Sequence, residues 1–237
     1  MELCANNEEV INKQSLQSEG FCVVKNVLKP ETCLLLRELY AKDQHYRSTI
    51  DMQRYNFARG QYRYFNYPFP EIISRLRRYF YENLVDCANE WSQRLLHEMK
   101  FPADFYAFEQ SQYEANQAKP TPLVLKYQEG DYNCLHQDVT SEKYFPYQMV
   151  FLLSKKDIDF AGGEIILAQQ RPRMQTIAHV INIDQGDALI LSSKYHPTLG
   201  VKGYYKSNFK HGVAKILRGE RYSLGIIFHN YVGGDGD

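Results

Sequence analysis

The second half of the chain alternates short apolar runs with turns, and this pattern constrains the fold more than any other feature of the sequence. Runs rich in β-branched, aromatic and leucine residues follow Pro120, separated by segments several of which contain Gly or Asn. They lie at residues 122–127, 132–138, 147–153, 163–168, 177–183, 187–192 and 221–229. Short strands at regular spacing predict a sandwich, a jelly roll or a barrel, and the 19 tyrosines and 13 phenylalanines suit a β-rich fold.

The first half of the chain is mainly of helical character. Its predicted elements are a helix over residues 8–18 that ends before Gly20, a strand over residues 21–24, a helix that begins at Pro30, and a helical region over residues 70–100 with room for a break near Asn83. Residues 44–67 are expected to be irregular. We therefore predict an α+β protein in which a helical support region, residues 1–119, and a β-domain, residues 120–237, form one compact domain together.

Charge and cysteine content limit the class of function. The formal net charge is zero, with 28 basic and 28 acidic residues, so bulk charge indicates neither nucleic acid nor a membrane, and a local patch would be needed. The cysteines are odd in number and lack C-x-x-C spacing, which predicts free thiols in a reducing compartment, the cytoplasm. The polar, acidic N-terminus MELCANNEEV is not expected to be a signal peptide, and no apolar run reaches membrane-spanning length.

The stretch LKYQEGDYNCLHQD, residues 125–138, contains the spacing that a metal site requires. His136 and Asp138 are two residues apart, and on a strand such residues project from the same face. An imidazole and a carboxylate side by side are two of the three ligands of the facial triad that holds non-haem Fe(II). The pair alone also fits a surface histidine beside a solvated aspartate, so the interpretation depends on a third ligand downstream.

The third ligand must come from the histidines that follow, at positions 179, 196, 211 and 229. Arg221 stands ten residues after His211 and opens the last strong β run, and Ser223 shares its strand face. A planar guanidinium beside a hydroxyl is a good receptor for a carboxylate, because it donates two parallel hydrogen bonds. This context favours His211 as the third ligand.

His196 is the alternative ligand. Lys206 stands ten residues beyond it, but the surrounding GYYKSNFK is expected to be a connecting loop, not a strand. His179 lies among apolar neighbours and is expected to be structural, and His229 falls at the end of the last strand, past the anion site.

His136-x-Asp138, His211 and Arg221-x-Ser223 together resemble the signature of the Fe(II)/2-oxoglutarate-dependent dioxygenases. The resemblance extends from Gly20 to His229 and is carried by the segments GFCVVKNVLKPETCLLLRELY, RGQYRYFNYPFP, FAGGEIIL, QQRPRMQ, GDALIL and KHGVAKILRGERYSLGIIFH. These segments are similar to one bacterial-type family of the class, associated with oxidative demethylation of damaged nucleic acid. Lys210 departs from the pattern, which has Arg there. The resemblance implies a double-stranded β-helix, or jelly roll, with N-terminal helices packed outside.

The resemblance also implies the cofactors and their ligands. Fe(II) would be held by His136, Asp138 and His211, with 2-oxoglutarate and O2 at the remaining positions. The distal carboxylate of 2-oxoglutarate would lie on Arg221, with Ser223 and Tyr127 donating hydrogen bonds, although Tyr127 also fits an ordinary core position. Decarboxylation to succinate and CO2 would be coupled to oxidation of a substrate C–H bond, and no protein general acid or base is expected.

Residues 44–67 contain the candidate substrate surface. Arginines at positions 47, 54, 59 and 63 lie among Tyr62 and other aromatic residues, a combination found where single-stranded nucleic acid binds. We assign Arg54, Arg59, Tyr62 and Arg63 to this surface. The alternative is a packed lid whose arginines pair with Asp43, Asp51 and nearby backbone, and the zero net charge favours it.

Three functions remain open from the sequence. Alkylated nucleic acid, single-stranded or damaged, is the first candidate substrate of a dioxygenase; the others are a protein (prolyl-type) hydroxylase and a non-catalytic, cupin-like metal-binding protein. Gly162-Gly163 is expected to form a plain hairpin. The segment Arg171-Pro172-Arg173 fits either a solvated loop or a part of the substrate rim.

Overall fold

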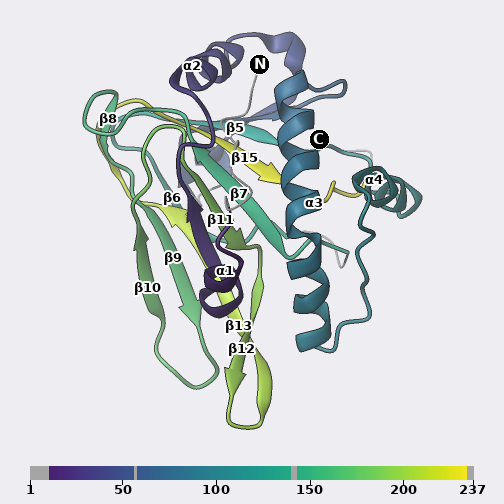
Figure 1. Ribbon diagram of the computed structural model, residues 1–237. Coiled ribbons are helices and arrows are strands. Elements are labelled where there is room, and N and C mark those ends of the chain that lie inside the picture. Colours follow the sequence, from purple (N-terminus) through teal and green to yellow (C-terminus); the bar gives the residue numbers. More distant parts are fainter. Residues whose placement is uncertain (1–10, 56–57, 140–142, 234–237) are drawn as a thin grey trace.

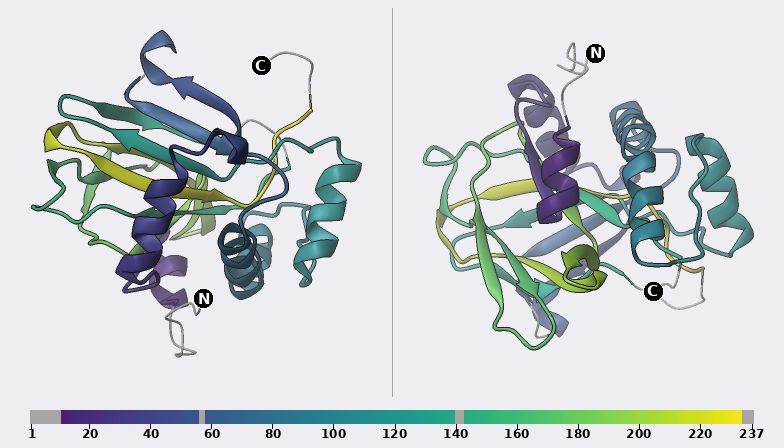
Figure 2. Two further views of the ribbon diagram at one scale, coloured as in Figure 1. Left: turned by 90° about the horizontal axis from the view of Figure 1, so that it is seen from above. Right: turned by 60° about the horizontal axis from the view of Figure 1, so that its bottom comes forward.

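The computed structural model describes residues 11–55, 58–139 and 143–233. Most of its strands form two main sheets that face each other (Figures 1 and 2), and two further short strands pair separately. The helices are α1 (Lys13–Glu19), α2 (Pro30–Leu39), α3 (Glu71–Arg94) and α4 (Phe105–Glu114), with 3-10 turns η1 (Asp43–His45) and η2 (Met52–Tyr55). The strands are β1 (Phe21–Val24), β2 (Tyr46–Asp51), β3 (Ala58–Arg59), β4 (Gln61–Phe65), β5 (Leu123–Tyr127), β6 (Tyr132–His136), β7 (Tyr147–Leu152), β8 (Phe160–Gly162), β9 (Ile165–Gln170), β10 (Ile177–Ile181), β11 (Ala188–Ser192), β12 (Tyr195–Gly200), β13 (Gly203–Val213), β14 (Ile216–Gly219) and β15 (Arg221–Ile227).

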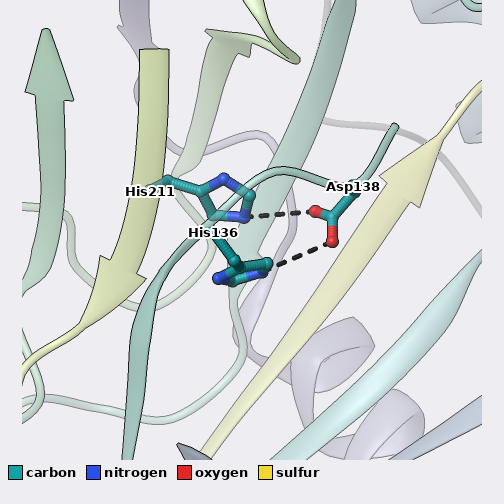
Figure 3. A group of neighbouring side chains, drawn as sticks. All are labelled: His136, Asp138 and His211. Carbon is teal, nitrogen blue, oxygen red and sulfur yellow. Dashed lines mark ion pairs between the residues drawn. The ribbon is translucent and has the colours of Figure 1, made fainter. Parts of the chain in front are cut away.

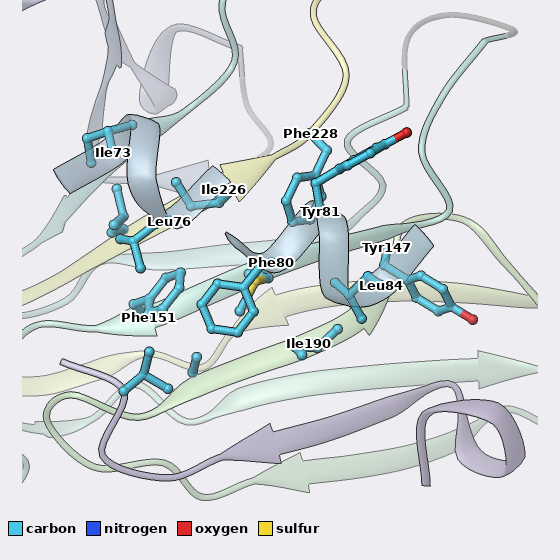
Figure 4. Close-up of a cluster of buried hydrophobic side chains, with 14 of the residues drawn as sticks. Ile73, Leu76, Phe80, Tyr81, Leu84, Tyr147, Phe151, Ile190, Ile226 and Phe228 are labelled. Carbon is cyan, nitrogen blue, oxygen red and sulfur yellow. The ribbon is translucent and has the colours of Figure 1, made fainter. Parts of the chain in front are cut away.

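The central strands of the larger sheet are buried on both faces. Its seven strands run in the order β1-β11-β7-β15-β5-β4-β2, with α3 lying along one face (Figure 1). Because both faces of the sheet are covered at its centre, the central strands are near-continuous apolar runs, such as ALILS in β11. On the helix side, Phe151 and Ile190 pack with Leu76 and Phe80 of α3 (Figure 4). The rings of Phe80 and Phe151 meet edge to face at 5.9 Å.

The smaller sheet packs against the opposite face of the larger one. Its order is β10-β9-β13-β6-β3, and β12 also pairs with β13. A second apolar core, which includes Leu152, Leu167, Leu189 and Leu191, fills the space between the sheets. Two facing antiparallel sheets with helices outside are the predicted α+β jelly roll, so this prediction is confirmed.

Several predicted elements are confirmed and others are wrong. Gly20 ends α1 in the left-handed conformation, at φ +83°, as expected of a helix stop. The helix itself begins at Lys13, and residues 8–10 of the predicted segment lie outside the described residues. No break occurs near Asn83: α3 continues through it, with Tyr81 before it and Leu84 after it both buried, and the Asn83 side chain donates to the carbonyl of Tyr79 one turn earlier. Helix α4 was not predicted, and Asp104 caps it by accepting from the backbone N–H of Ala107 at 2.8 Å.

Two segments that were expected to be irregular are strands. Residues 44–67 contain β2 and β4, which pair with each other, and β4 then pairs with β5 at the edge of the larger sheet. Residues 203–210 belong to β13, the longest strand of those described. Both corrections have the same cause: polar and aromatic residues alternate there, and a strand tolerates this when only one of its faces is buried.

Strands from both sides of residue 120 share the larger sheet, since β1, β2 and β4 precede that residue and the other strands follow it. The division of the chain at residue 120 stays a prediction. None of the described helices is both long enough and apolar enough to cross a bilayer.

Candidate active site

Two histidines on neighbouring strands face one aspartate between the sheets (Figure 3). His136 ends β6 and is the direct cross-strand partner of His211 in β13, which places their ring centroids 4.3 Å apart. His136 Nε2 lies 3.3 Å from Asp138 Oδ1, and His211 Nε2 lies 3.2 Å from Asp138 Oδ2. The ligand atoms of the three residues lie within 4.8 Å of one another. The fold therefore brings together the three residues that the sequence predicts as metal ligands.

The reason that was given for the pairing of His136 with Asp138 is wrong in one respect. Strand β6 ends at His136, so Asp138 does not share a strand face with it. Asp138 lies in the segment that follows, and its side chain turns toward both imidazoles (Figure 3). The two-residue spacing still serves the site, because it keeps the carboxylate within reach of the strand end.

Electrostatics keep the carboxylate ionised. Burial alone would raise the pKa of Asp138, but the charges of His211 and His136 and their hydrogen bonds outweigh it and hold that pKa well below its usual value. His136 Nδ1 lies 2.8 Å from the carbonyl oxygen of Cys134, to which it donates when Nε2 is the unprotonated nitrogen. Two imidazoles and one ionised carboxylate form a donor set that suits a divalent transition metal, and it leaves coordination positions open.

Gln148 completes the surroundings of the triad and was missed by the sequence analysis. Its Nε2 donates to Asp138 Oδ2 at 2.8 Å and lies 3.3 Å from His211 Nε2. The side chain is buried, and its Oε1 has no hydrogen-bond partner among the described residues. A buried amide oxygen without a partner costs free energy unless a ligand or water satisfies it. The available signal was a single amide in the apolar run YQMVFLL.

A cavity of about 510 Å³ opens in front of the triad, within the range of small-molecule sites. Apolar side chains, among them Leu125, Val150, Ile165 and Val213, form much of its wall. The cavity is also lined by Arg47, Tyr62, Tyr64 and Tyr231. A mainly apolar chamber with polar groups at selected points restricts water and orients a ligand.

Arg221 is a buried cation without an acidic partner. It is 1% exposed, and no described carboxylate forms an ion pair with it. Its Nη1 donates to Ser223 Oγ at 3.2 Å, and Nε has no partner. Burial lowers the pKa of Arg221 to about 10, although the nearby Tyr127 and Glu164 oppose this shift. Since a buried charge is costly when unpaired, the arrangement suits an anionic ligand.

Tyr127 lies beside this arginine. The two residues are cross-strand partners in β5 and β15, and the guanidinium carbon of Arg221 lies 5.8 Å from the centre of the Tyr127 ring. Burial raises the pKa of Tyr127 to about 12, so the hydroxyl stays protonated and can donate. It accepts a hydrogen bond from Asn133 at 3.3 Å. Tyr127 and Ser223 also line the cavity, so they connect its interior to Arg221.

The plain hairpin predicted at Gly162-Gly163 is wrong, because β8 pairs with β14, whereas β9 pairs with β10 and β13 in another sheet. Gly163 has φ +65°, and a Cβ there would lie 2.4 Å from Ile216 Cδ1 and 3.0 Å from Arg221 Cδ. A side chain at this position would push against the arginine from behind. The second glycine therefore leaves the space that the Arg221 side chain occupies.

The other candidate histidines lie outside the triad. His196 is buried against the ring of Phe209, with Nε2 3.3 Å from the carbonyl oxygen of Ser18, and burial lowers its pKa to about 4. His229 is also buried, and burial lowers its pKa to about 4. The loop predicted after His196 is part of β13, so that argument against His196 was wrong. The strand register separates the two, because His196 pairs with Ser207 while His211 pairs with His136.

The predicted substrate residues are only partly brought together. Strand alternation turns Tyr62 into the cavity and Arg63 to the opposite face, where Arg63 Nη2 lies 2.5 Å from Asp43 Oδ1. Arg54 and Arg59 are exposed, and Arg59 borders a separate polar cleft of about 310 Å³. Among the four arginines of this segment, Arg47 lines the cavity, with its guanidinium carbon 4.4 Å from the centre of the Tyr64 ring.

Comparison with solved structures defines the class of protein. The fold is similar to that of a Pseudomonas putida prolyl-4-hydroxylase, with a TM-score of 0.55 and 15% identity over 93% of this chain and 97% of that one. It is also similar to an oxidoreductase of the 2OG-Fe(II) oxygenase family from Burkholderia pseudomallei, with a TM-score of 0.53 and 13% identity over 94% and 90% of the chains. The chain therefore has the fold of the 2OG-Fe(II) oxygenases, and its His136, Asp138 and His211 fit iron binding.

Sequence relatives define the family. The Oxygenase-NA family, described as "Oxygenase, catalysing oxidative methylation of damaged DNA", matches residues 60–231. An uncharacterized protein of Mycobacterium tuberculosis is 36% identical over 163 residues, which cover 69% of this chain and 70% of the relative. The chain belongs to this family of oxygenases, which confirms the predicted enzyme class and disagrees with the non-catalytic alternative.

The role of Gly163 can be tested by stability. Gly163→Ala should lower the free energy of unfolding by about 1–3 kcal/mol more than Gly130→Ala, the cost expected of overpacking. Gly130 is the matched control, because it also has positive φ, +86°, but a Cβ there would meet nothing within 4 Å. Chemical denaturation of both variants gives the difference, and equal losses would show that only backbone strain matters at Gly163.

Proposed function

We propose that the chain is an Fe(II)- and 2-oxoglutarate-dependent dioxygenase that acts on alkylated nucleic acid. The observation that carries the proposal is an ionised carboxylate between two imidazoles on the cavity wall, together with a buried arginine beside Ser223 and Tyr127, two residues that line the same cavity. Among the described residues, no carboxylate pairs with this arginine. The proposed iron ligands are His136, Asp138 and His211, and the proposed 2-oxoglutarate ligands are Arg221, Ser223 and Tyr127.

In this proposal the iron centre, with 2-oxoglutarate and O2, supplies the oxidative decarboxylation that is coupled to oxidation of a substrate C–H bond. The chain supplies position and exclusion of water. Arg221 binds the distal carboxylate through its charge, and the hydroxyls of Ser223 and Tyr127 donate to the same group. Gln148 donates to Asp138 and so orients the carboxylate toward the histidines. No side chain needs to transfer a proton.

The nucleic-acid substrate is supported by the family description and by the composition of the cavity wall. Tyr62, Tyr64 and Tyr231 contribute aromatic rings, and Arg47 contributes a guanidinium that lies over the ring of Tyr64. Aromatic faces stack on nucleobases, and arginine binds phosphate or the face of a base. These features support base contacts by Tyr62 and its cavity neighbours. Arg54 and Arg59 lie outside the cavity, and Arg63 pairs with Asp43.

We also propose a reducing, cytoplasmic location. Cys22, Cys33, Cys87 and Cys134 are free thiols. Burial raises the pKa of both Cys22 and Cys33 to about 12, which keeps these two thiols protonated and unreactive.

The metal site is tested by removing its ligands one at a time. His136→Ala, Asp138→Ala and His211→Ala should each weaken Fe(II) binding sharply and abolish succinate formation, since each removes one of three protein ligands. Equilibrium dialysis with Fe(II) under anaerobic conditions measures binding directly. His196→Ala is the control and should retain Fe(II) binding. If His196→Ala loses Fe(II) binding while His211→Ala retains it, His196 and not His211 is the third ligand.

The 2-oxoglutarate site is tested at Arg221. Arg221→Ala should weaken 2-oxoglutarate binding by about 2–5 kcal/mol, the cost of leaving a desolvated carboxylate unpaired, and should leave Fe(II) affinity much less affected. Arg221→Lys should recover only part of the loss, because an ammonium keeps the charge and loses the planar fork. Titration of 2-oxoglutarate against succinate release provides the measurement. If Arg221→Ala needs the same 2-oxoglutarate concentration as the wild type, Arg221 does not bind the 2-oxoglutarate carboxylate.

The substrate class is tested by coupling. Single-stranded DNA that carries N-methylated bases should stimulate succinate formation and release formaldehyde in equal amount, because an oxidised N-methyl group is lost as formaldehyde. Unmethylated DNA of the same sequence is the control for binding without reaction. Proline-containing peptides form the third arm. Stimulation by peptide alone, with a hydroxylated peptide as product, would replace the nucleic-acid assignment with the protein-hydroxylase alternative.

A further inference from the structure

The positive charge of this neutral chain is concentrated in one region of its sequence. Residues 165–183 and 188–219 contain no Asp or Glu. Their cations are Arg171, Arg173, Lys194, Lys202, Lys206, Lys210, Lys215 and Arg218. Only Asp184 and Asp187 interrupt the region, and Asp187 is buried and paired with Lys25. Because the chain as a whole has zero net charge, the remainder is correspondingly acidic.

Strand β13 carries two of these lysines on the outer face of the smaller sheet. Ser207, Phe209 and His211 are buried, whereas Lys206 and Lys210 are exposed, as strand alternation requires. Asn208 lies between the two lysines on the same face. The hairpin of β12 and β13 extends beyond the rest of the sheet at the lower end of Figure 1. Lys206, Asn208 and Lys210 therefore form a polar, positive row on the outside of this hairpin.

Strand β12 adds an aromatic ring and a third lysine to the row. Tyr195 is the cross-strand partner of Asn208 and so projects from the same face. The ammonium groups of Lys194 and Lys206 lie 5.2 and 5.4 Å from the centre of the Tyr195 ring. We call Lys194, Tyr195, Lys206, Asn208 and Lys210 the hairpin surface.

The charges of the hairpin surface are not neutralised by ion pairs within residues 11–55, 58–139 and 143–233. Cations elsewhere in the described residues form ion pairs, among them Lys25, Arg37, Arg63, Arg77, Arg78, Arg94, Lys126 and Lys156. In the described part of the chain, no carboxylate forms an ion pair with Lys194, Lys206 or Lys210. Like charges held close together without counter-ions favour an anionic partner that spans them.

The hairpin surface is connected to the wall of the active-site cavity. Gln137 lines the cavity and donates through Nε2 to Asn208 Oδ1 at 2.6 Å and to the carbonyl oxygen of Phe209 at 2.6 Å. The same amide lies 3.3 Å from the carbonyl oxygen of Lys194. One side chain therefore contacts both the cavity and the hairpin surface, which lie next to each other at this point.

We propose that the hairpin surface binds the phosphate backbone of a single-stranded nucleic acid whose reacting nucleotide enters the cavity. The proposal rests on the proposed function and adds the path of the strand, which the sequence analysis had placed on residues 44–67. Repeated phosphates match a row of unpaired lysines, and Asn208 can donate to a phosphate or sugar oxygen. Arg63 of the earlier segment is excluded from this path, because it already pairs with Asp43.

The test compares two triple variants of the full chain. Lys194→Gln/Lys206→Gln/Lys210→Gln removes the charges of the hairpin surface and keeps polar side chains. Lys100→Gln/Lys155→Gln/Lys215→Gln is the control, since it removes the same charge from lysines that are exposed elsewhere. Thermal unfolding of both variants checks that each is folded like the wild type.

Binding is measured with fluorescein-labelled oligo(dT) by anisotropy at several salt concentrations. Each lost phosphate contact reduces the log–log salt slope by about 0.7 on a single strand, so the hairpin variant should lose about 2 from its slope. If the two proteins bind equally at 1 M salt, a slope smaller by about 2 means that the variant binds roughly 100-fold more weakly than the wild type at 0.1 M salt. The control variant should keep the wild-type slope.

Three outcomes would overturn the proposal. Equal losses in both triple variants would show that only net charge matters. If the wild type does not bind oligo(dT) at low salt, nucleic acid is not the partner of this surface. The assignments of the iron ligands and of Arg221 are tested separately and do not depend on that result. If poly-glutamate binds the wild type as tightly as oligo(dT) does, and the hairpin variant loses this binding, the surface would be assigned to an acidic protein. Asp138→Ala separates the two proposals, because it should lose turnover and still bind oligo(dT) with the wild-type slope.

Discussion

The buried positive charge of Arg221 is the constraint on which the arrangement of the site depends. The side chain is 1% exposed and has no carboxylate partner, so the fold must support a cation that water cannot reach. It does so with neutral groups: the hydroxyl of Ser223 accepts a hydrogen bond, and the rings of Tyr127 and Phe160 lie against the guanidinium. Gly163 provides the space for the side chain. These groups moderate the cost of the charge without neutralising it, and this incomplete compensation suits a dicarboxylate ligand.

The opposite charge depends on the pairing of two strands that are far apart in the sequence. His136 and His211 become neighbours only because β6 and β13 pair in the register that places them directly opposite. Their two imidazoles then hold the Asp138 carboxyl in its ionised form, against the effect of burial on its pKa. Gln148 reaches the same carboxylate from β7, so strands of both sheets meet at the triad. A shift of one residue in the β6–β13 register would turn one histidine out of the site.

The distribution of charge over the rest of the chain follows a simple division. Where the larger sheet meets the helices, cations are used internally, as Arg77 shows: it is buried, with an ion pair to Glu109 and a hydrogen bond to the carbonyl oxygen of Phe228. On the β12–β13 hairpin they are left unpaired. A chain of zero net charge can therefore still present a locally positive surface beside the cavity, which an overall charge count does not reveal.

The sequence by itself determined the properties that depend on local spacing. The regular apolar runs predicted a sandwich, a jelly roll or a barrel, and the resemblance to a dioxygenase family implied the jelly roll among them. Arg221 and Ser223 could be placed on one face because strand alternation is a local property. The three triad residues could be predicted from the two-residue spacing of His136 and Asp138, from the position of His211 ahead of Arg221, and from the resemblance to a dioxygenase signature. Gly20 was identified as a helix stop because only a few residues adopt its backbone conformation easily.

Only the tertiary structure decided which of several chemically similar residues face the site. Residues 62–64 read Tyr-Arg-Tyr, and both residue types tolerate either face of a strand. The pairing of β4 with β5 sends Tyr62 into the cavity and Arg63 toward Asp43. The register of β13 likewise separates His211 from His196, and the closure of the sheets makes Gln148 a buried neighbour of the triad. The physical reason is the same in each case: alternation along a strand is local, but the face that becomes buried is set by partners distant in the sequence.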